Sequence, residues 1–328
     1  MSENDGTQRS ELRETLEKNS RRNKRWLLAG GGLLAAGALV AGGAAVGGAF
    51  SAPAGASAAG AEDELSITIA GSGESALQDA IREVAAEEGL EIEWVNFTDD
   101  WVLPNTALVD GEVDANAFQH VAFLSAFNTE NDADLTPVLS TVITQWGIFS
   151  ASVGSLDEIG DGARIAIPDD ASNGGRALYI LEAAGLLEIA DDAGTYPTTD
   201  DVVENPRNLE LLPIAATTIA TQFDDPSLSA VVVGTSYFDP SQGIDKEDAL
   251  FLDDSLAESS LPYVNTITTR ADNVDNPAWD ILADVYDDPR VAEALEEDSF
   301  GNSVLVDVPA ETLQDKLAEL EELARELQ

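Results

Sequence analysis

Arg176 is an isolated cation in an acidic stretch, and its side chain suits the recognition of a carboxylate. It is the only Lys or Arg in residues 165–206, which contain nine acidic residues. A guanidinium presents a planar fork of N–H donors that matches the two oxygens of a carboxylate. Asn173 and a pair of glycines come just before it. The spacing therefore points either to an anion site or to a structural ion pair with Asp169 or Asp170.

The segment around Arg176 predicts a strand, a turn and a helix. An apolar run from residue 165 is followed by a turn-forming cluster at 169–175 and then by a helical pattern. Ser172 or Asn173 is the expected N-cap. A helix start leaves free backbone N–H groups and a partial positive charge. The helix would therefore add to the attraction of an anion.

The composition excludes several kinds of site. The 328 residues include no Cys and a single His, His120, which excludes disulfides, thiolate metal sites and multi-histidine zinc sites. We expect neither a metal nor a cofactor. Residues 62–328 hold 57 acidic and nine basic residues, a formal charge of −48. Nucleic acid is not an expected partner, because phosphate binding needs a basic surface. The acid excess favours a solvated, salt-adapted surface.

The first 64 residues predict a membrane tether. Residues 1–25 end in a basic cluster, and residues 26–50 carry no charge. At about 1.5 Å per residue, a helix over that run can cross a bilayer core of roughly 30 Å. The basic flank favours a cytoplasmic N-terminus and an exported domain, joined by a flexible tether at 51–64. The alternative is a cleaved signal peptide, with a small-residue cleavage site at 56–58, and a secreted product.

The remaining chain alternates between strand and helix patterns, which predicts an α/β fold with mostly parallel sheets. A long apolar, β-branched segment at 136–150 could carry the chain from one lobe of the protein to another. We expect strands at 65–70, 91–97, 113–118, 209–214, 229–233, 249–252 and 263–269, and helices at 75–88, 104–109, from 119, at 200–204 and at 277–297.

Three segments together resemble one known family. Residues 101–120 contain Asp-Ala-Asn followed by Phe-Gln-His, residues 165–186 contain Asn-Gly-Gly-Arg, and residues 262–273 contain Tyr-Val-Asn and Thr-Arg. In this order they closely resemble the methionine-binding, NlpA-type lipoproteins, which are extracytoplasmic receptors of ABC importers. The similarity covers about 65–306. It implies a two-lobed periplasmic-binding-protein fold without catalytic activity, which holds an amino acid in the cleft between its lobes.

The resemblance also implies a domain organisation. The chain would cross between lobes near Gln145 and again near Gly234. The first lobe would then comprise residues 65–145 and 235–308, and the second lobe residues 146–234. Residues 309–328 lie outside the resemblance and predict an amphipathic helix, because Leu313, Leu317, Leu320, Leu323 and Leu327 form one stripe. This helix is expected to pack on its own lobe.

The family's functional positions transfer to particular residues of this chain. Arg176 and Asn173 match the residues that hold the ligand carboxylate, whereas the other matching positions line the pocket wall. The complete set of ligand-binding residues implied by the resemblance is Trp101, Phe118, His120, Asn173, Arg176, Gly234 and Tyr237. Aromatic rings around a thioether are physically reasonable, because sulfur packs well near ring edges.

Three departures from the family pattern stand out. Gly234 replaces an Asn that contacts the polar end of the ligand, and Ala117 replaces a Phe. The lipid-bearing Cys is missing, so the helix at 26–50 would provide the anchor. Without the Asn at 234, either water fills the gap or the ligand brings a group of its own into it.

The sequence therefore predicts a membrane-tethered receptor that binds methionine or a related amino acid. It would deliver the ligand to an ABC permease and its ATPase. Two alternatives belong to other classes. One is a ligand-sensing ectodomain that signals through a partner, because 25 cytoplasmic residues cannot hold a kinase. The other is an enzyme with His120 as a general base, although no nucleophile or metal-ligand cluster accompanies this His.

Overall fold

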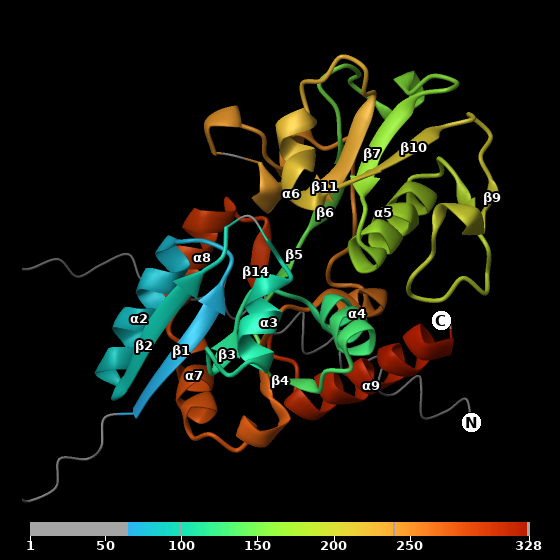
Figure 1. The fold of residues 1–328 in the computed structure, drawn as a ribbon. Helices are drawn as coiled ribbons and strands as arrows, with labels where there is room; N and C mark the ends of the chain where they lie inside the picture. Colours follow the sequence, from blue (N-terminus) through green and yellow to red (C-terminus); the bar gives the residue numbers. More distant parts are fainter. Residues whose placement is uncertain (1–64, 99, 239, 327–328) are drawn as a thin grey trace, which may run out of the picture.

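Two five-stranded sheets, each covered by helices on both faces, form two lobes (Figure 1). The structure is a computed structural model that describes residues 65–98, 100–238 and 240–326. The first lobe has the strand order β2-β1-β3-β13-β4 and the second the order β10-β7-β11-β6-β12. Both sheets are mixed, because β13 and β6 run antiparallel to their neighbours. The other four strands of each sheet run in one direction, as the expectation of mostly parallel sheets requires.

The first lobe contains β1 (Leu65–Gly71), β2 (Leu90–Asn96), β3 (Ala115–Asn116), β4 (Leu135–Ser140), β13 (Thr266–Arg270), α2 (Ala76–Glu87), α3 (Leu103–Val109), α4 (Val121–Asn131), α7 (Ala278–Tyr286), α8 (Pro289–Ser299) and α9 (Ala310–Glu326). The second contains β6 (Trp146–Phe149), β7 (Arg164–Pro168), β10 (Glu210–Ile214), β11 (Ala230–Gly234), β12 (Phe251–Leu252), α5 (Ala171–Ala183) and α6 (Ala216–Ile219). Two small ribbons pair β5 (Val142–Thr144) with β14 (Ser303–Leu305) and β8 (Glu188–Ile189) with β9 (Val202–Glu204).

Each sheet of the protein separates two apolar cores. In the first lobe, α2, α7 and α8 cover one face, where Ile67, Ile81 and Leu282 pack together. On the opposite face α3, α4 and α9 bury a second cluster that includes Leu108 and Leu124. Burial of these aliphatic side chains supplies the main driving force for both layers. The sheets are thereby held rigid, and their strand ends can carry a site.

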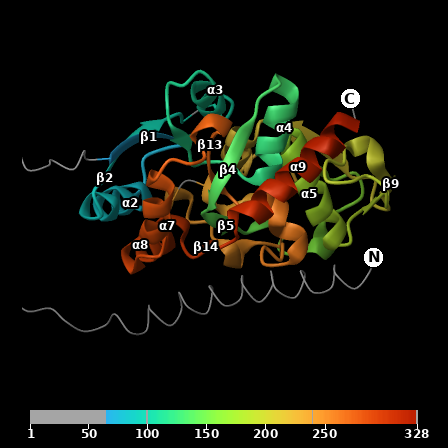
Figure 2. The same ribbon diagram turned by 90° about the horizontal axis from the view of Figure 1, so that it is seen from below.

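The C-terminal helix α9 belongs to the first lobe. It runs along α4 and β4 in both views (Figures 1 and 2). Leu313, Leu317 and Leu320 of the predicted stripe are buried in the core beside α4. Asn128 of α4 donates a hydrogen bond to Glu321 at 2.9 Å. The amphipathic face of α9 is therefore covered by its own lobe.

The chain passes between the lobes at two places. The first crossing joins β5 to β6 at Gln145. The second crossing was predicted near Gly234, but β12 pairs with β6 in the second sheet. The chain therefore returns to the first lobe only after Leu252, and residues 235–252 belong to the second lobe. The predicted boundary is wrong because pairing between distant strands, rather than the local pattern, fixes the lobe of β12.

Two local predictions also fail. Residues 200–204, expected to be helical, form the end of a 3-10 turn and strand β9. Helix α5 begins at Ala171, and its N-cap is Asp170 rather than Ser172 or Asn173. The two glycines that the sequence placed in a loop thus lie inside the first turns of the helix.

A contact away from the crossings also joins the lobes. The side chain of Tyr196, from the second lobe, is buried in the core of the first lobe beside α4. Its hydroxyl group hydrogen-bonds Ser125 and also donates to the carbonyl oxygen of Ala122 at 3.2 Å. Burial raises the pKa of Tyr196 to about 12. The tyrosine therefore stays neutral near pH 7 and serves as a fixed contact between lobes.

Predictions for residues 1–64 lie outside the residues that the structure describes. These are the cytoplasmic segment, the membrane helix at 26–50 and the tether. Among the helices of the described part, none has the length and apolar character needed to cross a membrane.

The acid excess predicts a stability that rises with salt. Residues 62–328 carry a formal charge of −48, so like-charge repulsion should destabilise the compact state, and counterions should screen it. Salt also screens the ion pairs of Arg290 with Glu87 and Asp288, but these pairs lie near the surface, so weakening them should cost little stability. We expect the melting temperature to rise steadily between 0.05 and 1 M NaCl in scanning calorimetry, and equally in KCl. A flat response would refute the salt-adaptation interpretation.

Candidate ligand-binding site

A cavity of about 500 Å³ lies between the lobes. Its lining includes Trp101, Phe118, His120 and Phe123 from the first lobe, and Trp146, Asn173, Arg176 and Tyr237 from the second lobe. Six of the seven predicted ligand-binding residues thus border one cavity, and Gly234 does not. Tyr237 stands on the second lobe, because the crossing occurs later than predicted.

Arg176 is buried at the base of this cavity, with 3% of its side chain exposed. Its Nε and Nη2 donate to Oδ2 of Asp253 at 3.2 and 2.6 Å, and Nη2 also donates to the carbonyl oxygen of Thr144 at 2.9 Å. The guanidinium carbon lies 4.9 Å from the ring centroid of Trp146 and 4.6 Å from that of Tyr263. Nη1 donates no hydrogen bond to any described residue. Arg176 therefore keeps free donors although it is part of an ion pair.

The ion-pair alternative was thus partly right, but its partner is Asp253 and not Asp169 or Asp170. Asp253 follows β12 in the segment that returns to the first lobe. The pair lies where that segment leaves the second lobe. Because the two charges offset each other, the base of the cavity has little net charge. It suits a zwitterion better than a simple anion.

The start of α5 is fixed by Asp170. Its carboxylate accepts the backbone N–H of Asn173 at 2.9 Å and the side-chain amide at 3.0 Å. The glycines of this turn permit close packing. A Cβ on Gly174 would lie 2.8 Å from the carbonyl oxygen of Pro168, and one on Gly175 would lie 2.9 Å from Cδ of Pro197. The glycines therefore serve helix packing, and Asn173 is positioned by the helix cap.

His120 connects the lobes across the cavity. It caps α4 by accepting the N–H of Phe123 at Nδ1, at 3.1 Å. The neutral ring then carries its proton on Nε2, which donates to Oδ1 of Asn173 at 3.0 Å. Burial lowers the pKa of His120 to about 4, and the charge of Arg176 acts in the same direction. With both nitrogens engaged, the ring offers no free lone pair for general-base chemistry.

Aromatic rings form part of the cavity wall. Trp101 lies 5.3 Å from Tyr237 and 6.3 Å from Phe123, measured between ring centroids, and Phe118 lies 6.0 Å from Phe123. Burial raises the pKa of Tyr237 well above its usual value, so its hydroxyl group stays neutral. These rings come from both lobes. They offer an apolar, polarisable surface for a ligand side chain.

The residues that the sequence missed include Trp146 and Asp253. Trp146 is the first residue of β6, directly after the first crossing. A residue directly after a crossing is expected to lie at the base of the cleft, so the sequence could have indicated Trp146 as a site residue. Asp253 is 77 residues from Arg176, and the sequence contains no pattern that relates the two.

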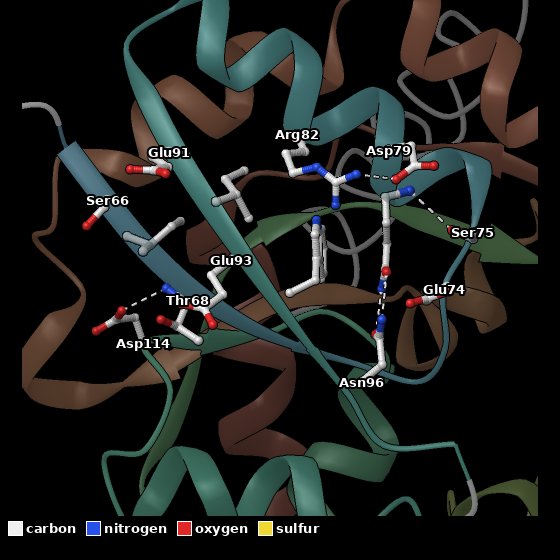
Figure 3. A pocket seen from close by; sticks show the side chains of 14 residues that line it. Ser66, Thr68, Glu74, Ser75, Asp79, Arg82, Glu91, Glu93, Asn96 and Asp114 are labelled. Carbon is white, nitrogen blue, oxygen red and sulfur yellow. Dashed lines mark hydrogen bonds and ion pairs between the residues drawn. The ribbon is translucent and has the colours of Figure 1, made fainter.

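Two further cavities are less suited to a small polar ligand. One of about 650 Å³ lies beside β1, β2 and α2, where Arg82 is paired with Asp79 (Figure 3). These two side chains are 52% and 70% exposed, so solvent screens them. The other, of about 540 Å³, lies behind Arg176 and is lined mainly by apolar groups. Within the described residues, no group of three or more His, Asp and Glu side chains could hold a metal ion.

Two α/β lobes that enclose a cavity with a buried Arg and an aromatic wall define a solute-binding protein of the periplasmic type. The model of the NlpA lipoprotein family matches residues 65–306. The chain belongs to this family, as its three motif segments predicted.

Known proteins support this assignment. The D-methionine-binding lipoprotein MetQ of Salmonella typhimurium is 35% identical over 232 residues, which is 70% of this chain and 84% of that protein. The substrate-binding protein of a methionine transporter from Streptococcus pneumoniae has a TM-score of 0.66 and 31% identity, covering 74% of this chain and 95% of that one. A nutrient-binding protein from Burkholderia cenocepacia, solved with bound methionine, has a TM-score of 0.66 and 30% identity, covering 74% of this chain and 99% of that one.

Proposed function

We propose that this protein is the extracytoplasmic receptor of an ABC importer and binds methionine or a closely related amino acid between its lobes. The observation that carries the proposal is Nη1 of Arg176, a donor without a partner among the described residues, in an interlobe cavity lined by aromatic rings. A ligand carboxylate in the cavity would accept from Nη1 in a charge-assisted hydrogen bond.

The remaining groups fit an amino acid. Trp101, Phe118 and Tyr237 would surround the ligand side chain, while Asn173 and His120 border its polar end. The Arg176–Asp253 pair is close to neutral overall, which favours a zwitterionic ligand. A zwitterion is also repelled little by the acidic surface of the protein, unlike an anion.

Hinge closure is the proposed mechanism of capture. The ligand would touch both lobes, so it would stabilise the closed arrangement relative to the open one. The His120–Asn173 hydrogen bond links the same two lobes. Contacts that exist only in the closed state then determine which ligands drive closure.

The uncharged run at 26–50 would hold the receptor at the membrane, and an ABC permease with its ATPase would receive the ligand. Fractionation of cells expressing the full chain tests the anchor. Recovery of the protein in the soluble fraction, with an N-terminus near residue 59, would favour the secreted alternative.

Isothermal titration calorimetry on the full chain in detergent tests the ligand. Bound ligand is first removed by partial unfolding and dialysis, and the twenty amino acids, D-methionine and short methionine peptides are then titrated. We expect binding by methionine or a near relative. Absence of binding by every amino acid and peptide would overturn the proposal.

A further inference from the structure

Trp146 occupies the base of the cleft directly under Arg176. Only 3% of its surface is exposed, although it borders the interlobe cavity. The Arg176 guanidinium lies over its ring, and Tyr237 packs edge-on at a centroid distance of 5.7 Å. Both neighbours line the same cavity. Trp146 is therefore held in place by two groups of the proposed site.

The indole N–H groups of Trp146 and Trp279 differ in their hydrogen bonding. Nε1 of Trp146 donates no hydrogen bond to any described residue, whereas Trp279 donates from Nε1 to the carbonyl oxygen of Asn273 at 2.8 Å. Trp146 and Arg176 both line the interlobe cavity, and neither the indole N–H of Trp146 nor Nη1 of Arg176 has a partner among the described residues. The two side chains are stacked, so a carboxylate bound in the cavity could accept from one donor with each of its oxygens.

Gly234 makes room for this indole. It pairs with Trp146 in the sheet, and a Cβ at position 234 would lie 2.8 Å from Nε1 and 3.1 Å from Cδ1 of the indole. It would also lie 3.2 Å from Cε2 of Tyr237. The space that a side chain at 234 would use is thus filled by Trp146. Gly234 acts by permitting the tryptophan and not by touching the ligand.

We propose that Trp146 is a ligand-contacting, specificity-determining residue, whose indole N–H donates to one carboxylate oxygen while Arg176 holds the other. The inference rests on the proposed function, because it concerns the same site. The indole offers a donor and no acceptor, so it recognises an oxygen and cannot recognise an ammonium group. The site therefore selects ligands with a free carboxylate over their amides.

The substitution Trp146→Phe tests this, because it keeps an aromatic ring and removes the N–H. We expect methionine affinity to fall about tenfold or more, which is the usual effect of losing a hydrogen bond to a charged group. Affinity for methioninamide, which lacks the charged oxygens, should fall less than about threefold. The melting temperature without ligand should fall by a few degrees, because the smaller ring packs less well under Arg176, so the comparison between the two ligands, and not stability, reports on the N–H.

Trp279→Phe is the matched control, since it removes a satisfied indole N–H outside the cleft. It should lower the melting temperature by about 2 °C and leave methionine affinity unchanged. Equal losses for methionine and methioninamide in Trp146→Phe, or no loss for either, would overturn the role of the indole N–H. If the unmodified protein binds no amino acid at all, the proposed function fails and this inference fails with it.

Gly234→Ala provides an independent test. The new methyl group should displace the indole, so methionine affinity should fall by a factor similar to that of Trp146→Phe. Because both changes remove the same contact, the double variant should bind about as well as either single variant. Losses that multiply in the double variant would contradict the coupling between these residues.

Discussion

Replacing Arg176 with leucine should lower methionine affinity by about 2–5 kcal/mol, the cost of truncating one partner of a buried charge contact. It should also lower the free energy of unfolding by about 3 kcal/mol, because Asp253 would keep its charge without a partner in a site where only 15% of it is exposed. Calorimetric titration and urea unfolding measure the two losses separately.

A paired variant separates binding from stability. Asp253→Asn removes the uncompensated charge but can still accept the backbone N–H of Trp146, which now donates to Oδ1 at 2.9 Å. Combined with Arg176→Leu, it should restore most of the stability and none of the binding. If Arg176→Leu alone binds methionine normally, the carboxylate is held elsewhere and Arg176 is purely structural.

Acid should destabilise the protein through His120. Its pKa is about 4 in the folded state against 6.5 as the ordinary value, because burial disfavours the charged ring. Between these values the unfolded state binds a proton that the folded state does not, so stability is lost as the pH falls from about 6.5 to 4. The shift corresponds to about 3 kcal/mol at the end of this window.

His120→Asn isolates this effect. Asparagine is a good N-cap and can still accept the N–H of Phe123, but it does not titrate. Urea unfolding at pH 7.5 and 4.5, in 1 M NaCl to screen the acidic surface, should show a smaller loss for the variant than for the unmodified protein. Asp170, Arg176 and Tyr263 remain near the ring in both proteins. Equal losses would show that His120 is already charged or solvated near pH 6.

The glycine at 234 illustrates how the structure changes a hypothesis. From the sequence, Gly234 left a gap to be filled by water or by a group of the ligand. In the structure the gap is occupied by Trp146, which comes from the neighbouring antiparallel strand. Cross-strand neighbours cannot be read from sequence spacing, because the register is set by the whole sheet.

Several features were accessible from the sequence alone. The apolar runs of β1, β2 and β11 and the amphipathic stripe of α9 follow from local periodicity and composition. Local patterns suffice here because the 2.0 and 3.6 residue periods decide which face of an element is buried. The three motif segments added the family and with it the two-lobed fold, whereas the ligand-binding roles that the resemblance implies stay predictions.

The tertiary structure alone decided the remaining features. The partner of Arg176 is Asp253, the lobe that carries Tyr237 is the second, and the indole of Trp146 lies against Gly234. Each of these depends on hydrogen bonds or packing between segments far apart in the chain. Such contacts form only when the strands are aligned in the sheet, because their geometry is a property of the assembled lobes and not of any single segment.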